Sequence, residues 1–466
     1  MLNDPRARTL HLYGRAGMGL TPSELAVSSA RSHAELVEEL FEHARSWEPL
    51  RVDHTPIDPR GYRRLSKVQQ TALRRTNQEE SRRLNRMWMR QLARTEGCLR
   101  EKMALFWHGH FACWTHWSLS AEHYLNTLRE HALGDFRQLL KAVSRAPAML
   151  EYLNNQQNRK GAPNENFARE VMELFTLGRG HYSEHDIKEA ARAFTGWGFE
   201  PGTDRFVFRE LQHDDGMKEF RGRTGAFTGE DILDMLTEDR RCAEFVSRKI
   251  YRWFVHPEVD EAFVADMARR FFESGYDIGA LMRHVLLSDH FLADRNRGSL
   301  VRSPVDLLCG LDKLFHFAFA DDRTPILLQR ALGQELLHPP SVAGWTLGNG
   351  WIDANALLTR LKLPSVLLNN GELEWEDPSG TADDMDRMVQ AEEPDMPLRD
   401  RRGRRIDALV DREGFLAQLD EGIPNEDLLA TLLVVEASPG LRRNLSAHGV
   451  WDRCLLILSS PEYQLC

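Results

Sequence analysis

The sequence predicts a mainly α-helical protein, built as one large multi-helical core with at most a small β-hairpin. Apolar residues recur at helical spacing along most of the chain, strand-like alternation is scarce outside 205–208, and no repeat of 30–50 residues is present. With 466 residues, 42% of them hydrophobic and 28% charged, the chain is long enough to bury a sizeable core. Its composition is that of a folded protein and not of a disordered tail.

The longest helical pattern runs over residues 71–111. Leu84, Trp88 and Leu92 recur at intervals of four residues, and Gly97 is the main breaker. The opposite face is rich in arginine, which we interpret as a solvated face paired with acidic neighbours, with an anion-binding surface as the alternative. Further helices are expected over 121–143, 164–177, 184–195, 229–254, 258–273, 276–289, 302–318, 324–336, 412–435 and 446–459.

Composition divides the chain into three parts. We expect a main helical domain over 1–370, an acidic loop or linker over 371–400, and a helical segment over 401–466 that packs back on the main domain. The middle segment has eleven acidic residues and two arginines, so it accounts for most of the formal charge of −10. The first 110 residues have 19 basic and 13 acidic residues, so nucleic acid is an unfavoured partner that the sequence still leaves open.

Several protein classes are poor fits to this sequence. The six cysteines are scattered singly, which argues against a disulfide scaffold, a cysteine-type zinc site and covalent haem attachment. No apolar stretch approaches the roughly 20 residues of a membrane span. The N-terminal residues contain no apolar signal region, so we expect a cytoplasmic protein, or a periplasmic or exported one if a signal peptide was removed. The motifs of serine hydrolases, P-loop NTPases, Rossmann dehydrogenases and zincins are absent.

The segment 163–178 carries the most informative carboxylate. Its helical period places Glu170 on the same apolar stripe as Phe167 and Val171, with Glu173 on the flank. A carboxylate on an apolar stripe is costly unless it is paired, protonated or bound to a metal. We therefore regard Glu170 and Glu173 as candidate metal ligands or acid–base groups. For Glu170, a buried ion pair with an arginine or a bond to a helix N-terminus is the alternative.

The motif Phe106–Phe111 contains two histidines two residues apart. On a helix such residues diverge by about 200°, and the apolar stripe places His110 inward and His108 outward. His110 is therefore a candidate metal ligand. A core histidine that hydrogen bonds to a neighbour is the alternative.

Two loops add further candidates. His213 and Asp214 lie in a polar loop after the strand candidate, and such residues serve both binding loops and ordinary turns. We regard both as candidate catalytic groups and His213 as a further metal ligand. Paired prolines and a glycine present Trp345, and we expect Trp107, Trp197 and Trp345 to line the cofactor pocket.

A set of sequence blocks carries a family resemblance: Arg15–Gly17, Phe106–Phe111, Lys160–Gly178, Tyr182–Trp197, His213–Asp214, Gln334–Trp345 and Ser459–Gln464. In this order they resemble the bacterial family called domain of unknown function 1800, over nearly the whole chain. The resemblance implies a large helical bacterial protein. Many members resemble exported proteins and are often encoded beside members of domain of unknown function 1501, which look related to sulfatases and phosphatases. A protein of that second family is thus a candidate partner, and no catalytic residue is carried over.

Two functional hypotheses follow. The first is a helical enzyme or cofactor protein whose site lies where 106–111, 164–178 and 213–218 converge, because histidines and carboxylates on facing helices hold di-iron and related metals. A divalent metal is its expected cofactor, with noncovalent haem as the alternative. The second is a non-catalytic binding or accessory protein that acts with a hydrolase-like partner. Its buried polar residues would form structural networks.

Overall fold

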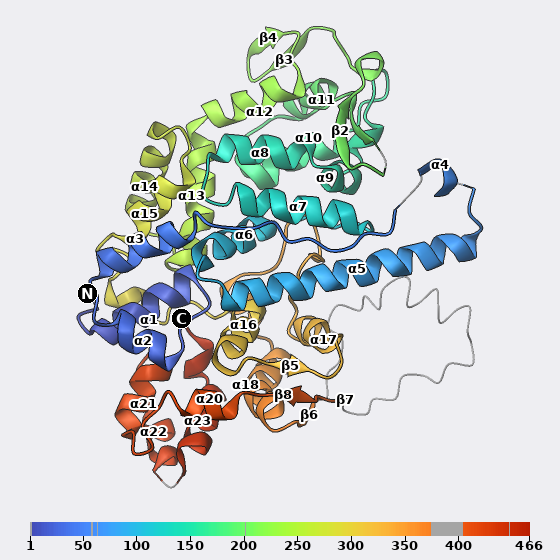
Figure 1. Cartoon of the computed structure of the whole chain (residues 1–466). Helices are drawn as coiled ribbons and strands as arrows, with labels where there is room; N and C mark the ends of the chain where they lie inside the picture. Colours follow the sequence, from blue (N-terminus) through green and yellow to red (C-terminus); the bar gives the residue numbers. More distant parts are fainter. Residues whose placement is uncertain (1, 57–58, 63, 201, 374–403, 447) are drawn as a thin grey trace.

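Helices dominate the computed structural model, which describes residues 2–56, 59–62, 64–200, 202–373, 404–446 and 448–466. Strands form only small antiparallel pairs, so the predicted fold class is confirmed. Within these ranges no helix combines the length and the apolar character that crossing a membrane requires. Figure 1 shows α5 (Lys67–Arg94) crossing the middle of the molecule, with α7 (Ser118–Glu130) and α8 (Phe136–Arg145) on one side and α16 (Pro304–Phe315) and α18 (Ala354–Leu368) on the other.

The helices in chain order are α1 (Pro5–Ala16), α2 (Pro22–Ser28), α3 (His33–His43), α4 (Pro59–Tyr62), α5 (Lys67–Arg94), α6 (Cys98–His110), α7 (Ser118–Glu130), α8 (Phe136–Arg145), α9 (Pro147–Tyr152), α10 (Asn166–Glu170), the π-helix η2 (Val171–Thr176), α11 (Glu184–Ala193), α12 (Gly229–Glu238), α13 (Arg240–Phe254), α14 (Glu261–Glu273), α15 (Ile278–Leu286), α16 (Pro304–Phe315), α17 (Thr324–Ala331), α18 (Ala354–Leu368), α20 (Arg412–Leu416), α21 (Asn425–Leu432), α22 (Pro439–Leu445) and α23 (Val450–Leu458).

The strands pair locally. β1 (Trp197–Glu200) and β2 (Arg205–Phe208) form the hairpin predicted around 205–208. The other pairs are β3 (Lys218–Phe220) with β4 (Arg223–Gly225), β5 (Ala318–Phe319) with β8 (Ala408–Leu409), and β6 (Glu372–Leu373) with β7 (Arg404–Arg405). The last two pairs join strands that precede and follow residues 374–403. Those residues, and with them most of the predicted acidic loop 371–400, lie outside the described part of the chain.

Several sequence patterns are divided into shorter helices than expected. The 71–111 pattern separates into α5 and α6 because the chain is extended at Thr95 (ψ 146°) and Gly97 caps α6. The 229–254 pattern divides at Asp239, whose side chain accepts the Arg241 N–H and starts α13. Apolar residues continue across these breaks because the helices on both sides face the same core. The sequence pattern predicts no helix over α1, α2, α3, α9, α18 and α22.

Helix α6 is buried along nearly its whole length. Its apolar side chains, including Met103, Phe106 and Trp107, belong to the main hydrophobic cluster. Four polar side chains are buried with them, each at most 3% exposed: Glu101, Lys102, His108 and His110. A helix buried on all sides leaves no water to hydrate such groups, so each needs a partner in the protein.

The charged side chains of α6 bind three other helices. Glu101 accepts hydrogen bonds from the Arg129 guanidinium of α7 at 2.7 Å and from the Trp88 indole of α5 at 3.0 Å. The Lys102 ammonium pairs with Asp306 of α16. A folded protein loses much stability when one partner of a buried ion pair is left without the other. These contacts therefore fix the positions of the helices around α6.

The histidines of α6 bind backbone groups on two different sides. His108 Nε2 accepts the Leu337 N–H at 3.0 Å, and His110 Nε2 donates to the Phe175 carbonyl at 3.1 Å. The prediction that His108 points outward is wrong, because the segment that includes Leu337 and Trp345 covers that face of the helix. Burial lowers the pKa of His108 to about 3, so its ring is neutral.

An extended segment, residues 47–56, lies along α7 and α5 and is held by their side chains (Figure 1). Asn126 accepts the Leu50 N–H at 3.0 Å and donates to the Leu50 carbonyl at 2.8 Å. The buried carboxylates of Glu122 and Glu80 accept backbone N–H groups further along the segment. These side chains thus form the hydrogen bonds to the backbone of the segment that a neighbouring strand would form in a sheet.

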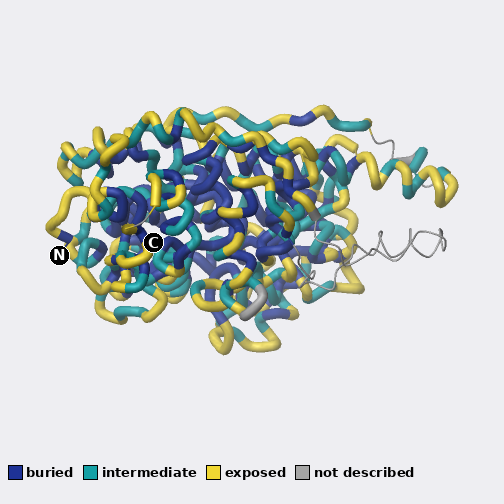
Figure 2. The backbone as a smooth tube through the Cα atoms, turned by 90° about the horizontal axis from the view of Figure 1, so that it is seen from below, coloured by how far each residue is buried: buried dark blue, intermediate teal, exposed yellow. Residues whose placement is uncertain are grey.

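The arginine face of α5 has acidic neighbours within the structure. Arg82 and Arg86 lie 3.6 and 3.5 Å from the Glu79 carboxylate, and Arg94 lies 2.7 Å from Asp312. Figure 2 shows the first turns of α5, together with α4, extending away from the buried body of the molecule. The contacts agree with the interpretation of this face as a solvated, paired surface.

We expect Arg129→Met to lower the free energy of unfolding by about 3–5 kcal/mol, because the Glu101 carboxylate would remain buried without its counter-charge. Urea unfolding followed by tryptophan fluorescence measures this loss. The double variant Arg129→Met/Glu101→Leu should recover much of it. Arg137→Met, which removes an exposed pair with Asp135, is the matched control and should cost less than about 1 kcal/mol. Equal losses for Arg129→Met and the control would contradict the central role of the pair.

Candidate functional site

The helix that carries Glu170 changes its pitch directly after that residue. α10 ends at Glu170 and continues as the π-helix η2, in which the hydrogen bonds span one residue more than in an α-helix. At its end, the N–H groups of Leu177 and Gly178 both donate to the Met172 carbonyl, at 2.9 and 3.1 Å. Short π-helices are rare and often occur at functional sites, because they redirect side chains that an α-helix would align.

The buried His110 and the half-buried Lys249 bind the last carbonyls of η2. His110 Nε2 donates to the Phe175 carbonyl at 3.1 Å, and the Lys249 ammonium donates to the Leu174 carbonyl at 3.4 Å. Burial, together with the nearby charge of Lys249, holds the pKa of His110 well below its ordinary value. Burial also lowers the pKa of Lys249 to about 8. His110 thus acts as a neutral cap for the end of this helix.

Glu173 has both carboxylate oxygens occupied. The Tyr182 hydroxyl donates to one oxygen at 2.5 Å, and the Arg179 guanidinium donates to the other. These hydrogen bonds, that of Tyr182 first, lower the pKa of Glu173 below its ordinary value. Glu173 is therefore ionised and held by the protein itself.

Glu170 is half-buried and forms no hydrogen bond or ion pair with any other described residue. The arginine nearest in sequence, Arg169, instead binds Glu184 through two hydrogen bonds of 2.9 Å. Burial, with the negative charge of Glu173 second, raises the pKa of Glu170. Of the two carboxylates predicted on this helix, Glu170 is thus the one that holds a proton more readily and has free oxygens.

Tyr152 is the aromatic residue near Glu170, since the Glu170 charge acts on its pKa, and further rings lie next to Tyr152. The Trp114 ring stacks on His338 with 5.0 Å between centroids and lies 6.4 Å from Tyr152. Burial, with Cys113 and Glu170 nearby, raises the pKa of Tyr152 to about 12. We use the name aromatic–carboxylate surface for a set of half-buried residues from the loop after α6, the end of α9, α10 and the segment after α17: Trp114, Trp117, Glu151, Tyr152, Glu170 and His338.

Glu151 is the second carboxylate of the aromatic–carboxylate surface. The Thr115 hydroxyl donates to it at 3.2 Å and the Trp117 indole at 3.4 Å. Burial outweighs these hydrogen bonds and raises the pKa of Glu151. Among the described residues, Glu151 and Glu170 are the two carboxylates whose pKa clearly rises. Shifts of this kind cluster at functional sites, which favours this surface over the rest of the described chain.

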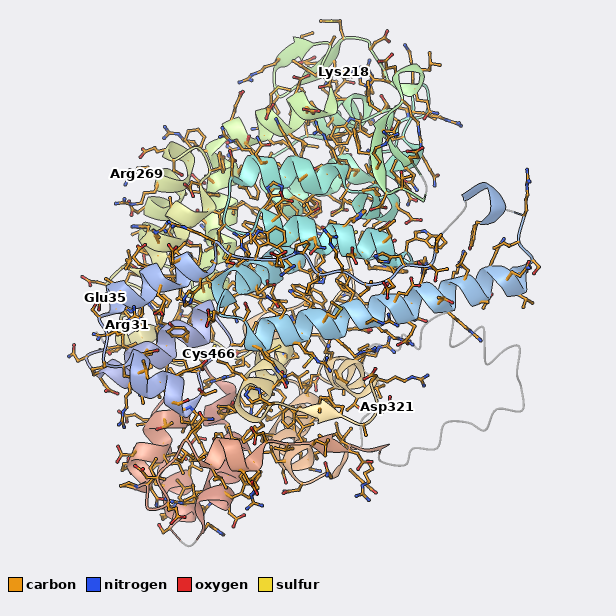
Figure 3. All side chains as sticks on the ribbon, in the orientation of Figure 1. Arg31, Glu35, Lys218, Arg269, Asp321 and Cys466 are labelled. Atoms are coloured by element: carbon orange, nitrogen blue, oxygen red, sulfur yellow. The ribbon has the colours of Figure 1, made fainter. Side chains whose placement is uncertain are left out.

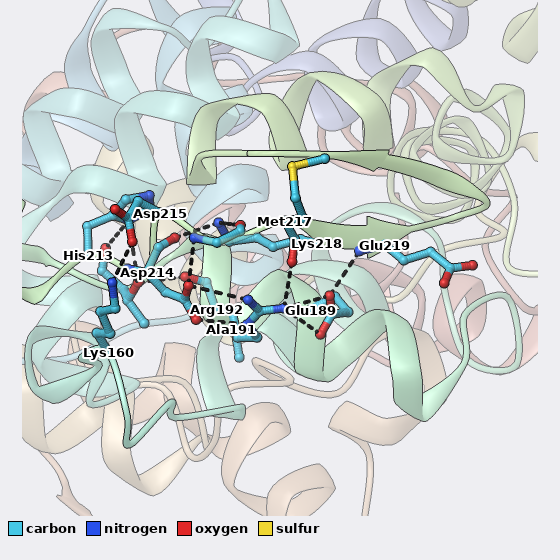
Figure 4. Close-up of polar contacts among 12 residues, drawn as sticks. Lys160, Glu189, Ala191, Arg192, His213, Asp214, Asp215, Met217, Lys218 and Glu219 are labelled. Carbon is cyan, nitrogen blue, oxygen red and sulfur yellow. Dashed lines mark hydrogen bonds and ion pairs between the residues drawn. The ribbon is translucent and has the colours of Figure 1, made fainter.

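The polar groups of the loop after β2 bind one another and Arg192 of α11, as Figure 4 shows. The Arg192 guanidinium donates to the Asp214 carboxylate at 2.8 Å, and this hydrogen bond lowers the pKa of Asp214 to about 2. The buried Lys218 ammonium donates to the Asp214 carbonyl and to a second carbonyl of the loop. Asp214 therefore acts as the anchor of a turn.

His213 lies in the same loop and binds the end of α11. Its Nδ1 donates to the Thr195 carbonyl at 2.9 Å, whereas His110 binds Phe175. In the part of the chain that the structure describes, no three His, Cys, Asp or Glu side chains gather in a way that could hold a metal ion. Of the predicted set, the structure places Glu170 and Glu173 on one helix and gives His110 and His213 separate backbone partners.

The three predicted tryptophans differ in position. Trp107 is fully buried and donates to the Ala132 carbonyl at 3.0 Å, and Trp197 is buried against Phe194 with 5.2 Å between ring centroids. Trp345 is half-buried and lies edge-on to His108 at 5.1 Å. Trp107 and Trp197 thus belong to the core, while Trp345 reaches the surface.

A close backbone contact holds the segment that carries His338 and Trp345. Gly344 has a φ of +78°, and a Cβ added there would lie 2.3 Å from the Gly109 carbonyl oxygen. Only glycine fits both constraints. This contact seats the segment on α6 and so places His338 against Trp114.

Sequence reasoning missed Trp114, Trp117, Glu151, Tyr152 and His338. One signal for them exists: Cys113–Trp117 is a short non-helical stretch with two tryptophans and a histidine, and bulky aromatic residues in a connecting loop often line a binding surface. Glu151 follows the apolar helix start Pro147–Leu150 with no special spacing. Its role is visible only from its neighbours in space.

These observations define a mainly α-helical protein with a buried polar helix at its centre and one surface where aromatic rings lie with two carboxyl groups of raised pKa. The chain belongs to the family described as protein of unknown function (DUF1800), whose family model matches residues 11–465. The resemblance inferred from the sequence blocks is thereby confirmed. Neither the curated proteins nor the solved structures contain a match to this chain.

We expect Glu170→Gln to raise the melting temperature at neutral pH, because it removes a half-buried charge that has no partner. The folded-state pKa of Glu170 is raised, so protonation favours the folded state below the ordinary glutamate range and that advantage is lost as pH rises. The gain from the substitution should therefore fade near pH 4, where both states become protonated. Differential scanning fluorimetry across this pH range measures it.

Glu173→Gln is the matched control, one helical turn away. The folded-state pKa of Glu173 is lowered, so its stabilisation is present above the unfolded pKa and is lost as pH falls. This variant should therefore lower the melting temperature at neutral pH, with a smaller effect in acid. A change of the same sign in both variants at neutral pH would show that Glu170 is paired after all.

Proposed function

We propose that this protein is a helical enzyme that uses Glu170 as its acid–base group and binds its substrate on the aromatic–carboxylate surface. One observation carries the proposal: Glu170 is a half-buried carboxylate with a raised pKa and no partner among the described residues. The other groups predicted to be catalytic, Glu173, His213 and Asp214, each bind another part of the protein. A carboxylate left unpaired at such a site is available to a ligand.

The surroundings of Glu170 suit proton transfer. A raised pKa lets the carboxyl group keep its proton closer to neutral pH, deliver it to a substrate atom and then accept one as a base. Trp114, Tyr152 and His338 provide half-buried ring faces that can orient the non-reacting part of a substrate by apolar contact. Glu151 adds a second carboxyl group, whose pKa burial also raises, for hydrogen bonding to polar substrate groups.

The predicted metal and haem sites receive less support than the acid–base role. A divalent metal would need oxygens of Glu173 that Tyr182 and Arg179 already occupy. The His110 Nε2 is likewise bound, and its ring is enclosed by core aromatics such as Phe106 and Phe111. The His110 Nδ1 has no partner in the described chain, but among the described residues no three His, Cys, Asp or Glu side chains gather into a set that could hold a metal.

A second candidate function is a non-catalytic accessory protein that acts with a partner of the domain of unknown function 1501 family. The structural use of the polar family motifs favours it: His108, His110 and Asp214 all serve to hold backbone segments. In this case the aromatic–carboxylate surface would contact the partner.

The two functions predict different effects of the substitution Glu170→Gln. Against a panel of chromogenic aryl esters, aryl glycosides and aryl phosphates, we expect the wild-type protein to turn over one class. Glu170→Gln should then lower kcat about 100-fold or more, with KM within about threefold, because the substitution removes the transferable proton but keeps the shape. Trp114→Ala should instead raise KM.

Glu165→Gln at the start of the same helix, where the side chain only faces Arg169, is the matched control and should behave as wild type. Unchanged turnover in Glu170→Gln would contradict the enzymatic proposal. So would a protein that turns over no member of the panel yet binds a domain of unknown function 1501 partner through Trp114. Such a result would support the accessory function.

A further inference from the structure

A second site lies where α1, α6, α13 and α16 meet the short helix η5 (Gly348–Trp351). Its lining residues include neither Glu170 nor any other residue of the aromatic–carboxylate surface. A small hollow of about 30 Å³ that opens to solvent is present there. Cys466, labelled in Figure 3 where the first helices meet the C-terminal ones, also borders it. The side chains that give the hollow its chemistry are Arg15, Lys102, Arg252, Asp306, Trp253 and Trp351.

The lining of the hollow is cationic. Arg15 and Lys102 are 1% and 3% exposed, and Arg252 is exposed at the rim. Asp306 is the single acidic side chain among the lining residues, and it is already paired with Lys102. Arg252 has no hydrogen bond or ion pair within the described ranges, and Lys102 has no partner there besides Asp306. Donor capacity thus remains on two cations that face one space.

Further buried positive charge lies next to this lining. Arg360 is fully buried, donates to Gln464 and to the Arg302 carbonyl, and keeps its Nη1 without a partner in the described chain. Arg15 donates to backbone and hydroxyl oxygens, among them the Cys466 oxygen at 2.7 Å; Cys466 and Asp306 supply the negative charge near it, and its Nε lacks a partner in the described chain. Buried cations in excess of their counter-charges are unfavourable, and a bound anion relieves that cost.

We propose that this hollow binds the oxyanion group of a small molecule, either a phosphate or a carboxylate. Lys102 and Arg252 donate to the oxyanion, and the Arg15 charge lies behind them. The N-terminus of α16, capped by Ser303 at the edge of the hollow, adds the positive end of its dipole. The Trp253 and Trp351 side chains flank the remainder of the ligand. This proposal does not depend on the role of Glu170.

Thermal unfolding in increasing sodium phosphate or sodium acetate tests the site, with sodium chloride of equal ionic strength as the reference. We expect one or both oxyanions to raise the melting temperature of the full chain in a saturable way, and the one that saturates at the lower concentration identifies the preferred group. Arg252→Ala should weaken the apparent affinity about tenfold, because one charge-assisted hydrogen bond is lost.

Arg248→Ala is the matched control, one turn earlier on α13. Arg248 binds Glu261 at 2.7 and 2.6 Å and does not line the hollow, so its loss should leave the anion response unchanged. The double variant Lys102→Met/Asp306→Asn removes the buried pair together and should abolish the response. Glu170→Gln should keep it, which separates this site from the aromatic–carboxylate surface. No stabilisation beyond that of chloride, or equal weakening by Arg248→Ala and Arg252→Ala, overturns the proposal.

Discussion

The need to pair four buried polar groups on α6 constrains the rest of the structure. Glu101, Lys102, His108 and His110 are enclosed in the core, and their partners come from α5, α7, α16, η2 and the segment after α17. These elements are far apart in the sequence. An unpaired buried polar group costs about 1–3 kcal/mol and a charged one more, so any packing that separates one of them from α6 is disfavoured. The apolar core gives cohesion, while these contacts specify which elements meet.

The same requirement decides which polar groups remain available for chemistry. The carbonyls at the end of η2 need donors, and His110 and Lys249 supply them, so His110 is occupied by the fold. Glu173 lies within the π-helix, and the Tyr182 hydroxyl binds its carboxylate. Glu170 lies just before the widened turns and outside this network. Its half-buried carboxylate, which has no partner among the described residues, therefore differs from Glu173, His213 and Asp214, which each bind another part of the protein, and such exceptions are where function is expected.

The sequence predicts the fold class and singles out Glu170 as a candidate, because helical periodicity and a carboxylate on an apolar stripe are local signals. It does not predict the site around Glu170. The stacking of Trp114 on His338 joins distant segments, and it depends on the close contact that Gly344 permits. The stripe also misplaces His108, since α6 is covered on both sides and an amphipathic pattern cannot show a second covered face.

The aromatic–carboxylate surface and the cationic hollow share two elements. α6 contributes Lys102 to the hollow and leads directly into Trp114, and the segment 337–351 begins beside His338 and ends with Trp351 in the hollow wall. Between its two ends, this segment packs closely on α6 where Gly344 meets the Gly109 carbonyl. Since any coupling free energy between two binding sites is reciprocal, an anion that changes ligand affinity at Trp114 must itself bind more tightly or more weakly by the same factor when that ligand is present.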